Sequence, residues 1–510
     1  MSLGRTYAVA LLGAGGSLVE IEADLANGLP GLNLIGLPDR ALGEAADRVR
    51  SAVVNAGLSL PARKLTVNLS PAALPKQGSG FDLGIALSVL CAAGLVPPES
   101  LASTVHFGEL SLDGRLRPTP GSLPAVIAAR AAGFTRVMVP AGNAAEAELV
   151  PGMTIVPVSS LGQAAIAHGA EIKPIDVPPL VSPTDHPVEA AEPTLDLSEV
   201  VGNHAAIDAV ITAAAGGHHL FMLGPPGAGK TMLAARLPGI LPDLSLDDAL
   251  EVASIASLSG ARQIQALSLR PPFEAPHHGT TMAAMVGGGS ANIKPGAIAR
   301  ASHGVLFLDE APEFPTTVLD ALRQPLESGA VTIQRAASTA TFPARFQLVL
   351  AANPCPCGQL GVSDRDCTCA PILRRRYLQR LSGPLLDRVD LHVTVDRVSA
   401  VIAASADGPY ISTAHARAQV EEARAIMAER LQSTGWQLNS QVSGAYLRSR
   451  LRLAPAVTKP LDRALERGHI TMRGYDRVLR VAWTLADLEG ATTPTTEHLS
   501  RGLFLRKGIQ

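Results

Sequence analysis

The sequence is poor in several features that each mark a particular class of protein. Aromatic residues make up only 3% of the 510 residues, which disfavours a nucleic-acid surface built on bases stacked against aromatic rings. The formal net charge is −2, so a surface for nucleic acid or an anionic membrane has to be a local basic patch. No window reaches the roughly 18 uninterrupted apolar residues that a membrane-spanning helix needs.

Cysteine and leader-like features are also scarce. Five cysteines in a chain of this length do not make a disulfide framework. The apolar stretch Tyr7–Leu12 has a single arginine before it and runs directly into Gly13–Gly16, which is too short for the apolar core of a secretory signal. We therefore expect a cytoplasmic protein with no membrane partner.

The length and the composition predict several folded domains. The chain is longer than one hydrophobic core organises, and its 47% share of hydrophobic residues is ample for globular structure. Residues 172–193 are dense in Pro, Asp and Glu without an apolar period, which is typical of a linker. We expect one domain over residues 1–171, the linker, a second domain over 194–400 and a third over 401–510.

The first domain has both strand and helix patterns. Apolar residues alternate in Ser17–Ala23 and Lys64–Leu69, and Arg136–Val139 is a further short apolar strand. Helices are predicted over Leu42–Ala56, which has one apolar stripe, and over Phe81–Ala93, which is apolar throughout. The mixture predicts an α+β fold.

The second domain alternates short apolar strands with helices. The predicted strands are Leu220–Leu223, Val305–Leu308 and Gln347–Ala351. Helices are predicted at Ala205–Ala215 and from Lys230 onward, which is typical of an α/β fold with a mainly parallel sheet covered on both faces. From Val401 onward only helical patterns occur, as in Thr413–Leu431 and Arg473–Leu488, and they predict an all-α lid.

A glycine-rich loop follows the first of these strands and precedes a helix. Gly224-Pro-Pro-Gly-Ala-Gly-Lys-Thr231 fits G-x-x-x-x-G-K-[ST], in which backbone N–H groups and the helix N-terminus cradle phosphates. Lys230 would bridge the β- and γ-phosphates of ATP, and the Thr231 hydroxyl would ligate Mg²⁺. The predicted nucleotide-binding residues of this segment are Gly224, Pro225, Pro226, Gly227, Ala228, Gly229, Lys230, Thr231 and Met232.

Polar residues end the next two apolar strands. Asp309, at the tip of Val305–Leu308, would hold Mg²⁺ together with Thr231, and Glu310 would polarise the attacking water as general base. Asn353 follows the third strand and would orient that water beside the γ-phosphate. The combination predicts an ATP hydrolase.

Five stretches carry a specific resemblance to one family. They are GPPGAGKTM, PHHGTTMAAMVGGG…KPGAIARASHGVLFLDE, AANPCPCG, SGPLLDRVD and TMRGYDRVLRVAWTLADLEG. Nearly end to end, the chain resembles the YifB/ComM group of magnesium-chelatase-like AAA+ ATPases. The resemblance implies a AAA+ P-loop core with a helical lid, and a hexameric ring in which a neighbouring subunit completes each active site.

The same resemblance implies roles for residues outside the phosphate loop. Arg388, in Leu-Leu-Asp-Arg-Val-Asp, corresponds to the arginine finger that acts on a neighbour's ATP, and Arg473, in Thr-Met-Arg-Gly-Tyr, to the sensor-2 arginine of the lid. Val201 and Gly202 would flank the adenine. The implied catalytic set is Lys230, Asp309, Glu310, Asn353, Arg388 and Arg473.

Two segments resemble pore-facing elements of the family. Residues 276–300, which contain His277 and His278, look like the helix-2 insert, and Val331–Phe346 alternates like a two-stranded hairpin. Their basic residues either contact phosphates of a threaded strand or are solvated loop charges. These residues are Lys294, Arg335 and Arg345. Adjacent histidines rarely face one ion, so a metal role for the histidine pair is disfavoured.

Four of the five cysteines form the pattern C-x-C…C-x-C after Asn353. Cys355, Cys357, Cys367 and Cys369 can supply four thiolates to a tetrahedral Zn²⁺ site, with a spacing inside each pair that is tighter than usual. Free thiols and a redox switch are the alternatives. The fifth cysteine, inside an apolar helix, is expected to be an inert core residue.

The first domain resembles the proteolytic, ribosomal-S5-like domain of Lon-type proteases. The stretches Pro75–Ala86, Phe107–Gly114 and Gly121–Pro124 carry this resemblance. Lon-type enzymes use a Ser–Lys dyad, but here Asp82 occupies the serine position and Pro124-Ala-Val126 the region of the lysine. We therefore expect a non-catalytic domain that serves the ring as a structural or docking collar, and no peptidase activity.

By this resemblance, the expected function is that of an ATP-driven DNA helicase that promotes branch migration in natural transformation or recombination. Single-stranded or branched DNA would be the partner, and Arg374-Arg-Arg376 with Arg380 is a basic cluster that fits either a DNA-facing or a subunit-interface surface. The alternatives are a chaperone-like ATPase that remodels a protein and a magnesium-chelatase-type motor. The expected cofactors are ATP, Mg²⁺ and a structural Zn²⁺.

Overall fold

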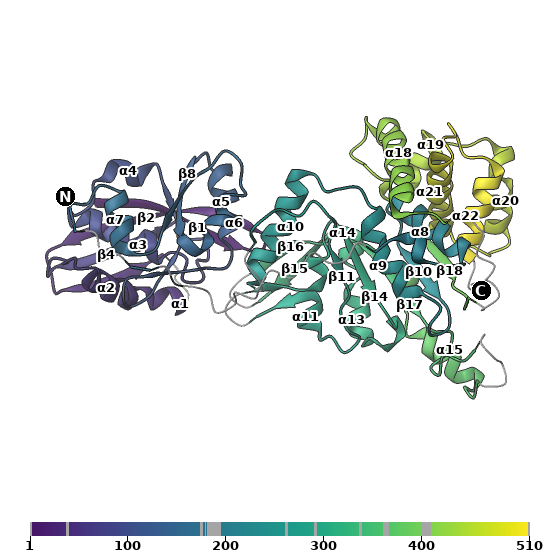
Figure 1. The fold of residues 1–510 in the computed structure, drawn as a ribbon, viewed down its shortest axis with the longest axis horizontal. Helices are drawn as coiled ribbons and strands as arrows, with labels where there is room; N and C mark the ends of the chain where they lie inside the picture. Colours follow the sequence, from purple (N-terminus) through teal and green to yellow (C-terminus); the bar gives the residue numbers. More distant parts are fainter. Residues whose placement is uncertain are drawn as a thin grey trace.

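The computed structural model describes residues 3–36, 40–173, 177–178, 180, 195–260, 264–289, 293–335, 339–360, 367–398 and 410–507. Three parts follow one another along the long axis: an N-terminal α+β part at one end, a central α/β core, and a helical part above the far end of the core (Figure 1). The predicted linker and the boundary at residue 400 lie largely outside the described residues, so the three predicted boundaries stay predictions.

The N-terminal part is built on a seven-stranded mixed sheet in the order β3-β4-β2-β1-β5-β8-β9. Its strands are β1 (Leu3–Leu12), β2 (Gly15–Ala26), β3 (Gly31–Ile35), β4 (Lys64–Ser70), β5 (Val105–His106), β8 (Arg136–Pro140) and β9 (Thr154–Val158). β2 is antiparallel to β1 and β4, and the other neighbours are parallel. The three predicted strands are confirmed, and the apolar stretch near the start of the chain belongs to β1.

Helices cover both faces of this sheet. α3 (Asp82–Ala92) packs beside Ala8 and Ala10 and is buried along its whole length, because it is apolar on all sides. α5 (Ser122–Ala131) packs on the opposite face against Val9. The smaller elements are α4 (Pro98–Ala102), β6 (Glu109–Leu110), β7 (Leu116–Arg117), α6 (Ala144–Ala147) and α7 (Leu161–Ala167).

One helix differs from its prediction. The single helix expected over Leu42–Ala56 is two helices, α1 (Arg40–Gly43) and α2 (Ala45–Asn55), which are separated at Glu44. The break comes directly after Gly43, and glycine has the lowest helix propensity of any residue except proline.

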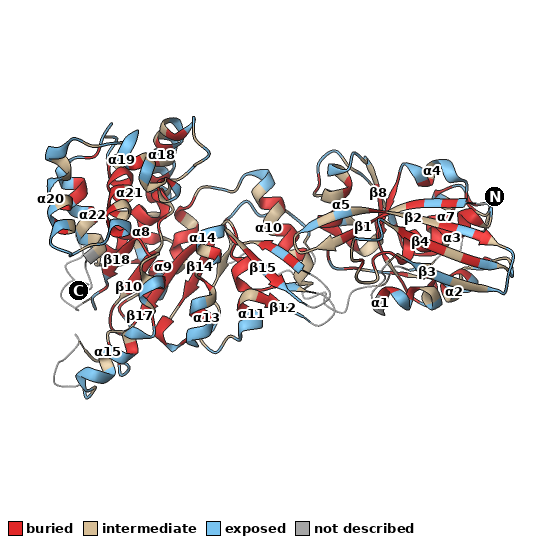
Figure 2. Cartoon of the chain, turned by 180° about the vertical axis from the view of Figure 1, so that it is seen from behind, coloured by how far each residue is buried: buried red, intermediate tan, exposed pale blue. Residues whose placement is uncertain are grey.

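The central core is a five-stranded sheet in the order β11-β14-β17-β10-β18, in which all neighbours are parallel. Its strands are β10 (Leu220–Leu223), β11 (Phe273–Glu274), β14 (Val305–Leu308), β17 (Gln347–Ala352) and β18 (Leu391–Thr394). The central strands are buried (Figure 2), as parallel strands covered on both faces are. The three predicted strands are confirmed, and β11 and β18 are additions to them.

Helices and a hairpin flank the core sheet. α8 (His204–Gly216) and α9 (Lys230–Ile240) cover one face, and the other face is covered by α10 (Leu246–Ser259) and the elements after it. These are α11 (Met282–Val286), β12 (Gly287–Gly288), β13 (Lys294–Pro295), α12 (Ala297–Arg300), α13 (Thr316–Ala321), α14 (Pro325–Ser328), β15 (Ala330–Gln334), β16 (Thr339–Pro343) and α16 (Gly383–Leu386). β15 and β16 form the predicted antiparallel hairpin. α15 (Pro371–Gln379) projects away from the core (Figure 1).

The described residues from 410 onward contain helices and no strand, as predicted. These helices are α18 (Thr413–Leu431), α19 (Gly444–Ser449), α20 (Pro455–Glu466), α21 (Met472–Leu488) and α22 (Thr496–Lys507). α18 and α21 pack on the face of the core that carries α8, and their buried residues join its hydrophobic cluster. Across the described part of the chain, no helix is both long and apolar enough to cross a bilayer.

The N-terminal part and the core share one hydrophobic cluster. Leu250 and Ala253 of α10 are buried together with Leu123 of α5. Beside them, the Gly121 N–H donates to Ser257 Oγ at 3.0 Å. Because α10 contributes side chains to both parts, it is the main mechanical connection between them.

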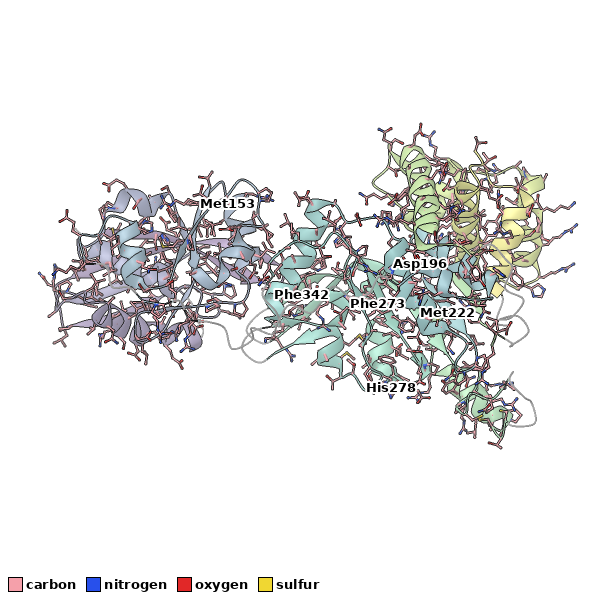
Figure 3. The ribbon with its side chains drawn as sticks, viewed as in Figure 1. Met153, Asp196, Met222, Phe273, His278 and Phe342 are labelled. Atoms are coloured by element: carbon pink, nitrogen blue, oxygen red, sulfur yellow. The ribbon has the colours of Figure 1, made fainter. Side chains whose placement is uncertain are left out.

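A second contact joins the β1–β2 turn to the hairpin. The Ala14 N–H donates to the Thr341 carbonyl of β16 at 3.3 Å. Gly13 has φ +65°, and a Cβ at this position would lie 2.2 Å from the Thr341 oxygen. A side chain at residue 13 therefore cannot be accommodated without moving the hairpin. Figure 3 labels Phe342, the next residue of β16, on the side of the core that faces the N-terminal part.

We predict that Gly13→Ala loosens this contact whereas Gly57→Ala does not. Both glycines have positive φ (+65° and +74°), so each alanine costs about 1–2 kcal/mol of backbone strain, but a Cβ at Gly57 meets nothing within 4 Å. Hydrogen exchange of the Ala14 amide and of the β15–β16 hairpin should rise only in Gly13→Ala. Equal exchange in the two variants would contradict the contact.

Candidate ATP site and cysteine cluster

The phosphate loop lies between the end of β10 and the start of α9. Gly224 follows the strand at a crowded point, where a Cβ would lie 2.1 Å from the Val395 carbonyl oxygen. Gly227 and Gly229 have φ of +75° and +93°, a backbone region that favours glycine. α9 begins at Lys230, so its first backbone N–H groups face the loop and favour an anion there.

The Lys230 side chain is folded back onto the loop. Its Nζ donates to the Gly224 carbonyl at 2.6 Å, to the Pro225 carbonyl at 3.0 Å and to Asn353 Oδ1 at 3.1 Å. Burial lowers the pKa of Lys230, and the carboxylates of Asp309 and Glu310 act in the opposite direction. The structure thus brings Lys230, in the loop after β10, into contact with Asn353, which follows β17.

One hydroxyl oxygen and one carboxylate oxygen lie close together beside the loop. Thr231 Oγ1 donates to Asp309 Oδ2 at 2.6 Å. Oxygen donors of this kind are those that Mg²⁺ prefers, and an ion held by both residues would replace this hydrogen bond. The adjacent Met232 is 44% exposed on α9, on the outside of the loop.

Glu310 has an unusual backbone conformation. Its φ of +50° is in the left-handed region, which is rare for residues other than glycine and is concentrated at functional sites. Its N–H donates to Asp309 Oδ1 at 2.9 Å. The Glu310 Oε2 atom lies 3.6 Å from His278 Nδ1, and Figure 3 shows His278 at the edge of the core. The His277-His278 pair is visible in the sequence, but the contact of His278 with the predicted general base is not.

The predicted adenine-flanking residues are connected to the phosphate loop. Val201 and Gly202 are half-buried and come directly before Asn203, whose Nδ2 donates to the Asp396 carbonyl at 2.8 Å. The Asp396 N–H donates back to Asn203 Oδ1 at 3.0 Å. The next residue, Arg397, donates from Nε to a proline carbonyl of the loop at 2.9 Å. The two segments therefore close one side of the site.

Arg388 lies at the opposite end of the sheet from the phosphate loop. It precedes β18, whereas the loop follows β10, and these parallel strands pair in register from Leu220–Leu391 to Leu223–Thr394. The four paired residues alone separate the two levels by about 10 Å. In this structure the guanidinium pairs with Glu327 and donates to the Pro384 carbonyl at 2.6 Å.

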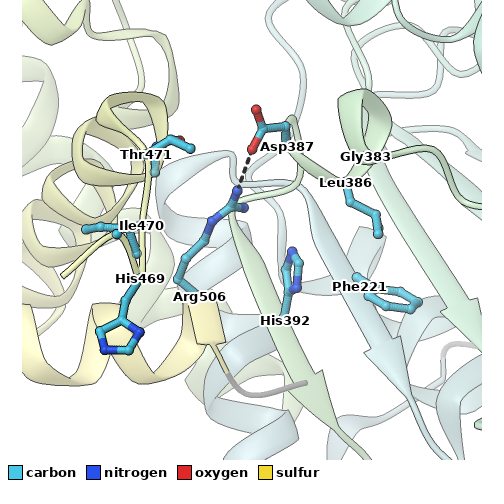
Figure 4. Close-up of a pocket in the computed structure, with 11 residues that line it drawn as sticks. Phe221, Gly383, Leu386, Asp387, His392, His469, Ile470, Thr471 and Arg506 are labelled. Carbon is cyan, nitrogen blue, oxygen red and sulfur yellow. Dashed lines mark hydrogen bonds and ion pairs between the residues drawn. The ribbon is translucent and has the colours of Figure 1, made fainter. Parts of the chain in front are cut away.

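Arg473 lies on the same side as Arg388. It is exposed in the first turn of α21, next to a cavity of about 340 Å³ between the lid and the loop before β18. Figure 4 shows Asp387 and Thr471 on the two sides of this cavity, with Arg506 donating to Asp387 Oδ1 at 3.2 Å. Both arginines are therefore remote from the phosphate loop of their own chain.

The four predicted cysteines form a compact cluster. Their Sγ atoms all lie within 4.8 Å of one another, at 3.4 Å for Cys355–Cys357, 3.7 Å for Cys355–Cys367 and 3.8 Å for Cys357–Cys367. A tetrahedral ion with Zn–S bonds of about 2.3 Å places sulfurs about 3.8 Å apart, which the cluster fits. Gly358, inside this segment, packs directly against the phosphate loop, since a Cβ there would lie 2.5 Å from Pro226 Cγ.

The basic residues singled out in the sequence lie on α15 and on the insert and hairpin of the core. On α15, Arg375 and Arg376 are exposed and have no ionic partner among the described residues, whereas Arg374 donates to Cys367 Sγ at 3.3 Å. The insert and the hairpin lie side by side, because a Cβ at Gly287 would lie 2.7 Å from Ile333 Cδ1. This arrangement places the basic residues of both elements together, namely Lys294 and Arg335. Arg345, beyond the hairpin, is also exposed.

Asp82 has a structural partner in the N-terminal part. Its carboxylate accepts two hydrogen bonds from Arg48, at 2.7 and 2.9 Å, and one from the Leu110 N–H at 3.2 Å. Burial raises the pKa of Asp82 to about 6, although Arg48 acts in the opposite direction. The residue at the serine position of the Lon-type pattern thus forms a buried ion pair.

Known protein families and individual proteins match this chain over almost its whole length. The family model of magnesium chelatase subunit ChlI matches residues 196–402, a second ChlI model matches residues 21–143, and the ChlI C-terminal model matches residues 411–506. An uncharacterized protein of Mycobacterium tuberculosis is 49% identical over 99% of both chains. Competence protein ComM of Haemophilus influenzae is 40% identical over 100% of this chain and 98% of its own, and YifB of Escherichia coli is 39% identical over 99% and 97%.

The chain belongs to the YifB/ComM family of magnesium-chelatase-like AAA+ ATPases. A shorter likeness, to Lon protease of Rhizobium meliloti, is 28% identical over 207 residues, which is 38% of this chain and 24% of that enzyme. Membership in this AAA+ family supports ATP hydrolysis with ATP and Mg²⁺ as the nucleotide and the ion, and the strand order and phosphate loop agree with it.

We predict that Glu310→Gln reduces the ATPase kcat by roughly 10²- to 10⁴-fold and leaves ATP binding intact, because the amide cannot accept a proton from water. Lys230→Ala should lose ATP binding itself. Steady-state hydrolysis and equilibrium binding of a fluorescent ATP analogue measure the two effects. Glu313→Gln, three residues along and exposed, is the matched control and should behave as wild type. A normal kcat in Glu310→Gln would refute its role as the base.

Proposed function

We propose that this chain assembles into a homo-hexameric ring and works as an ATP-driven DNA helicase that promotes branch migration in natural transformation or recombination. The proposed ring is supported by the positions of Arg388 and Arg473, which lie far from the phosphate loop of their own chain. A ring of identical subunits supplies both arginines to each site from the neighbour. The printed name of one relative, competence protein ComM, supports the biological setting.

In each site of this ring, the chain's own residues would divide the work. Lys230 would leave its carbonyl partners and bind the β- and γ-phosphates, and Thr231 and Asp309 would hold Mg²⁺. Glu310 would activate the water that Asn353 orients. Val201 and Gly202 would flank the adenine. The neighbour's Arg388 would leave Glu327 and stabilise the charge that develops on the transferred phosphoryl group.

The DNA would contact exposed basic residues of the described chain. The insert and the hairpin place Lys294 and Arg335 together, and α15 presents Arg375 and Arg376 to solvent. Such residues contribute as point charges on phosphates, which fits a chain with few aromatics. A magnesium-chelatase-type motor is the second candidate, because the family models are named for that enzyme's subunit.

We expect forked and single-stranded DNA to stimulate the wild-type ATPase several-fold at low salt, with Lys230→Ala as the blank. Arg375→Glu with Arg376→Glu should weaken the stimulation and flatten its salt dependence, because each lost phosphate contact removes a released counterion. Arg450→Glu with Arg452→Glu changes the same charge on the exposed lid and is the control. A hexameric, active wild type that ignores every DNA would refute the helicase and favour the second candidate or a chaperone-like ATPase that remodels a protein.

We also propose that Cys355, Cys357, Cys367 and Cys369 hold a structural Zn²⁺. The purified protein should contain about one zinc per chain, and Cys367→Ser with Cys369→Ser should contain none and lose ATPase activity on mild heating, since this segment packs on the phosphate loop. Cys91→Ser, at the buried cysteine outside the cluster, should keep the metal. Equal zinc contents by elemental analysis would rule the site out.

A further inference from the structure

A buried polar network joins the lid helix α21, which carries Arg473, to the loop that carries Arg388 and to the segment before β10. On α21, Arg477 Nη1 donates to the Arg388 carbonyl at 3.1 Å and also pairs with Asp390 Oδ1. The second oxygen of Asp390 lies 3.2 Å from His218 Nδ1, and His218 Nε2 lies 2.8 Å from Thr484 Oγ1 on α21. One continuous chain of contacts therefore runs from the lid to the strand base and back to the lid.

The network is desolvated, so its geometry is strongly constrained. His218 and Thr484 are 0% exposed and Asp390 is 2% exposed. Burial alone would raise the pKa of Asp390, but Arg477 and His218 hold it well below its ordinary value. An ionised Asp390 can only accept, so Nδ1 of His218 carries the hydrogen of their bond. Removing one partner leaves a buried charge uncompensated, which is costly.

Space for the network is reserved by a glycine. A Cβ at Gly216, the last residue of α8, would lie 2.3 Å from His218 Nε2 and 2.4 Å from Thr484 Oγ1. The φ of this residue is not in the left-handed region, so the glycine is needed for close approach and not for backbone shape. No other residue fits between the histidine and the threonine without displacing one of them.

The backbone around His218 also holds the neighbouring strands. Gln347 Nε2, at the start of β17, donates to the His218 carbonyl at 2.7 Å. The N–H groups of Asp390 and Leu391 both donate to the His219 carbonyl at 3.1 Å. The two histidines before β10 therefore fix the start of β17, which Asn353 follows, and the start of β18, which Arg388 precedes.

Arg477 lies on the helix that carries Arg473 and contacts the backbone of Arg388. It lies one helical turn after Arg473, on the same face of α21, because residues four apart on a helix share a face. Through its guanidinium it also holds the backbone of Arg388. A displacement of this one side chain would release the loop that carries Arg388 from the helix that carries Arg473.

We propose that Arg477, Asp390 and His218 are positioning residues that set Arg388 and Arg473 against the ATP of the neighbouring subunit. The inference rests on the proposed function in that it takes these two arginines to act on a neighbour. His218 precedes β10 and the phosphate loop follows it. The network would therefore couple the nucleotide bound by a subunit to the two arginines that the same subunit extends to its neighbour.

The variant Arg477→Met removes the guanidinium and keeps most of the side-chain volume. Its rings should lose roughly 10- to 100-fold in kcat, the effect of a displacement of about 1 Å at a catalytic group, with the KM for ATP unchanged within about two-fold. Arg480→Met is the matched control, because Arg480 lies one turn further along α21 and bonds the Val442 carbonyl inside the lid. It should retain wild-type kcat.

Rings that contain two kinds of mutant subunit distinguish two effects of Arg477→Met: misplaced arginines at the neighbour's ATP site, and damage to the mutant subunit's own fold. Subunits with Lys230→Ala have no working phosphate loop but carry intact arginines. When they are mixed with Arg477→Met subunits, the intact arginines complete the neighbouring phosphate loops, and activity should exceed the sum of the two proteins alone. Size-exclusion chromatography verifies that mixed rings form.

The reference mixture is Arg388→Ala with Lys230→Ala. If this mixture recovers activity and the Arg477→Met mixture does not, Arg477 acts within its own subunit and the inference is overturned. If neither recovers, the arrangement in trans is refuted, and the inference falls with the proposed function. If Arg477→Met does not fold, Thr484→Val is the second variant, because it removes only the hydroxyl beside His218. It should show a smaller loss of kcat, and mixed rings should recover that loss. The absence of recovery would overturn the proposal.

Discussion

The common direction of the five core strands is the constraint on which the arrangement of the site depends. In a parallel sheet, residues that follow strands gather at one edge and residues that precede strands at the other. Lys230, Asp309 and Asn353 follow strands and converge, although they are far apart in the sequence. Arg388 precedes a strand and is carried to the opposite edge. Under the proposed function, a complete site then requires two chains.

The sequence predicts best the segments whose pattern is short-range. β10, β14 and α18 have the predicted bounds, because buried apolar strands next to a glycine-rich loop and a long periodic helix have few alternative interpretations. β11 has only two residues, and in β18 the polar residues His392 and Thr394 interrupt the apolar pattern, so neither could be predicted in this way. The phosphate loop was predictable because its eight residues are contiguous, so glycines, lysine and threonine stand at fixed spacings in the sequence itself.

Contacts between distant segments were not predictable from spacing. The contact of His278 with Glu310 joins the ends of two adjacent strands, and no sequence rule relates their positions. The location of Arg473 follows from how α21 packs on α8, which is decided by the hydrophobic faces of both helices. A signal for the buried network was present in the His-His pair directly before β10, since polar residues at the start of a fully buried strand need partners.

The shared cluster at α10 has a mechanical consequence. Leu250 and Ala253 belong to the core by chain connectivity but pack among side chains of the N-terminal part, so the two parts move together where they meet. Most of the N-terminal sheet lies far from this joint along the long axis (Figure 1). Any rotation of α10 would therefore be passed to the N-terminal part, and the resulting displacement would be largest at the end farthest from this joint.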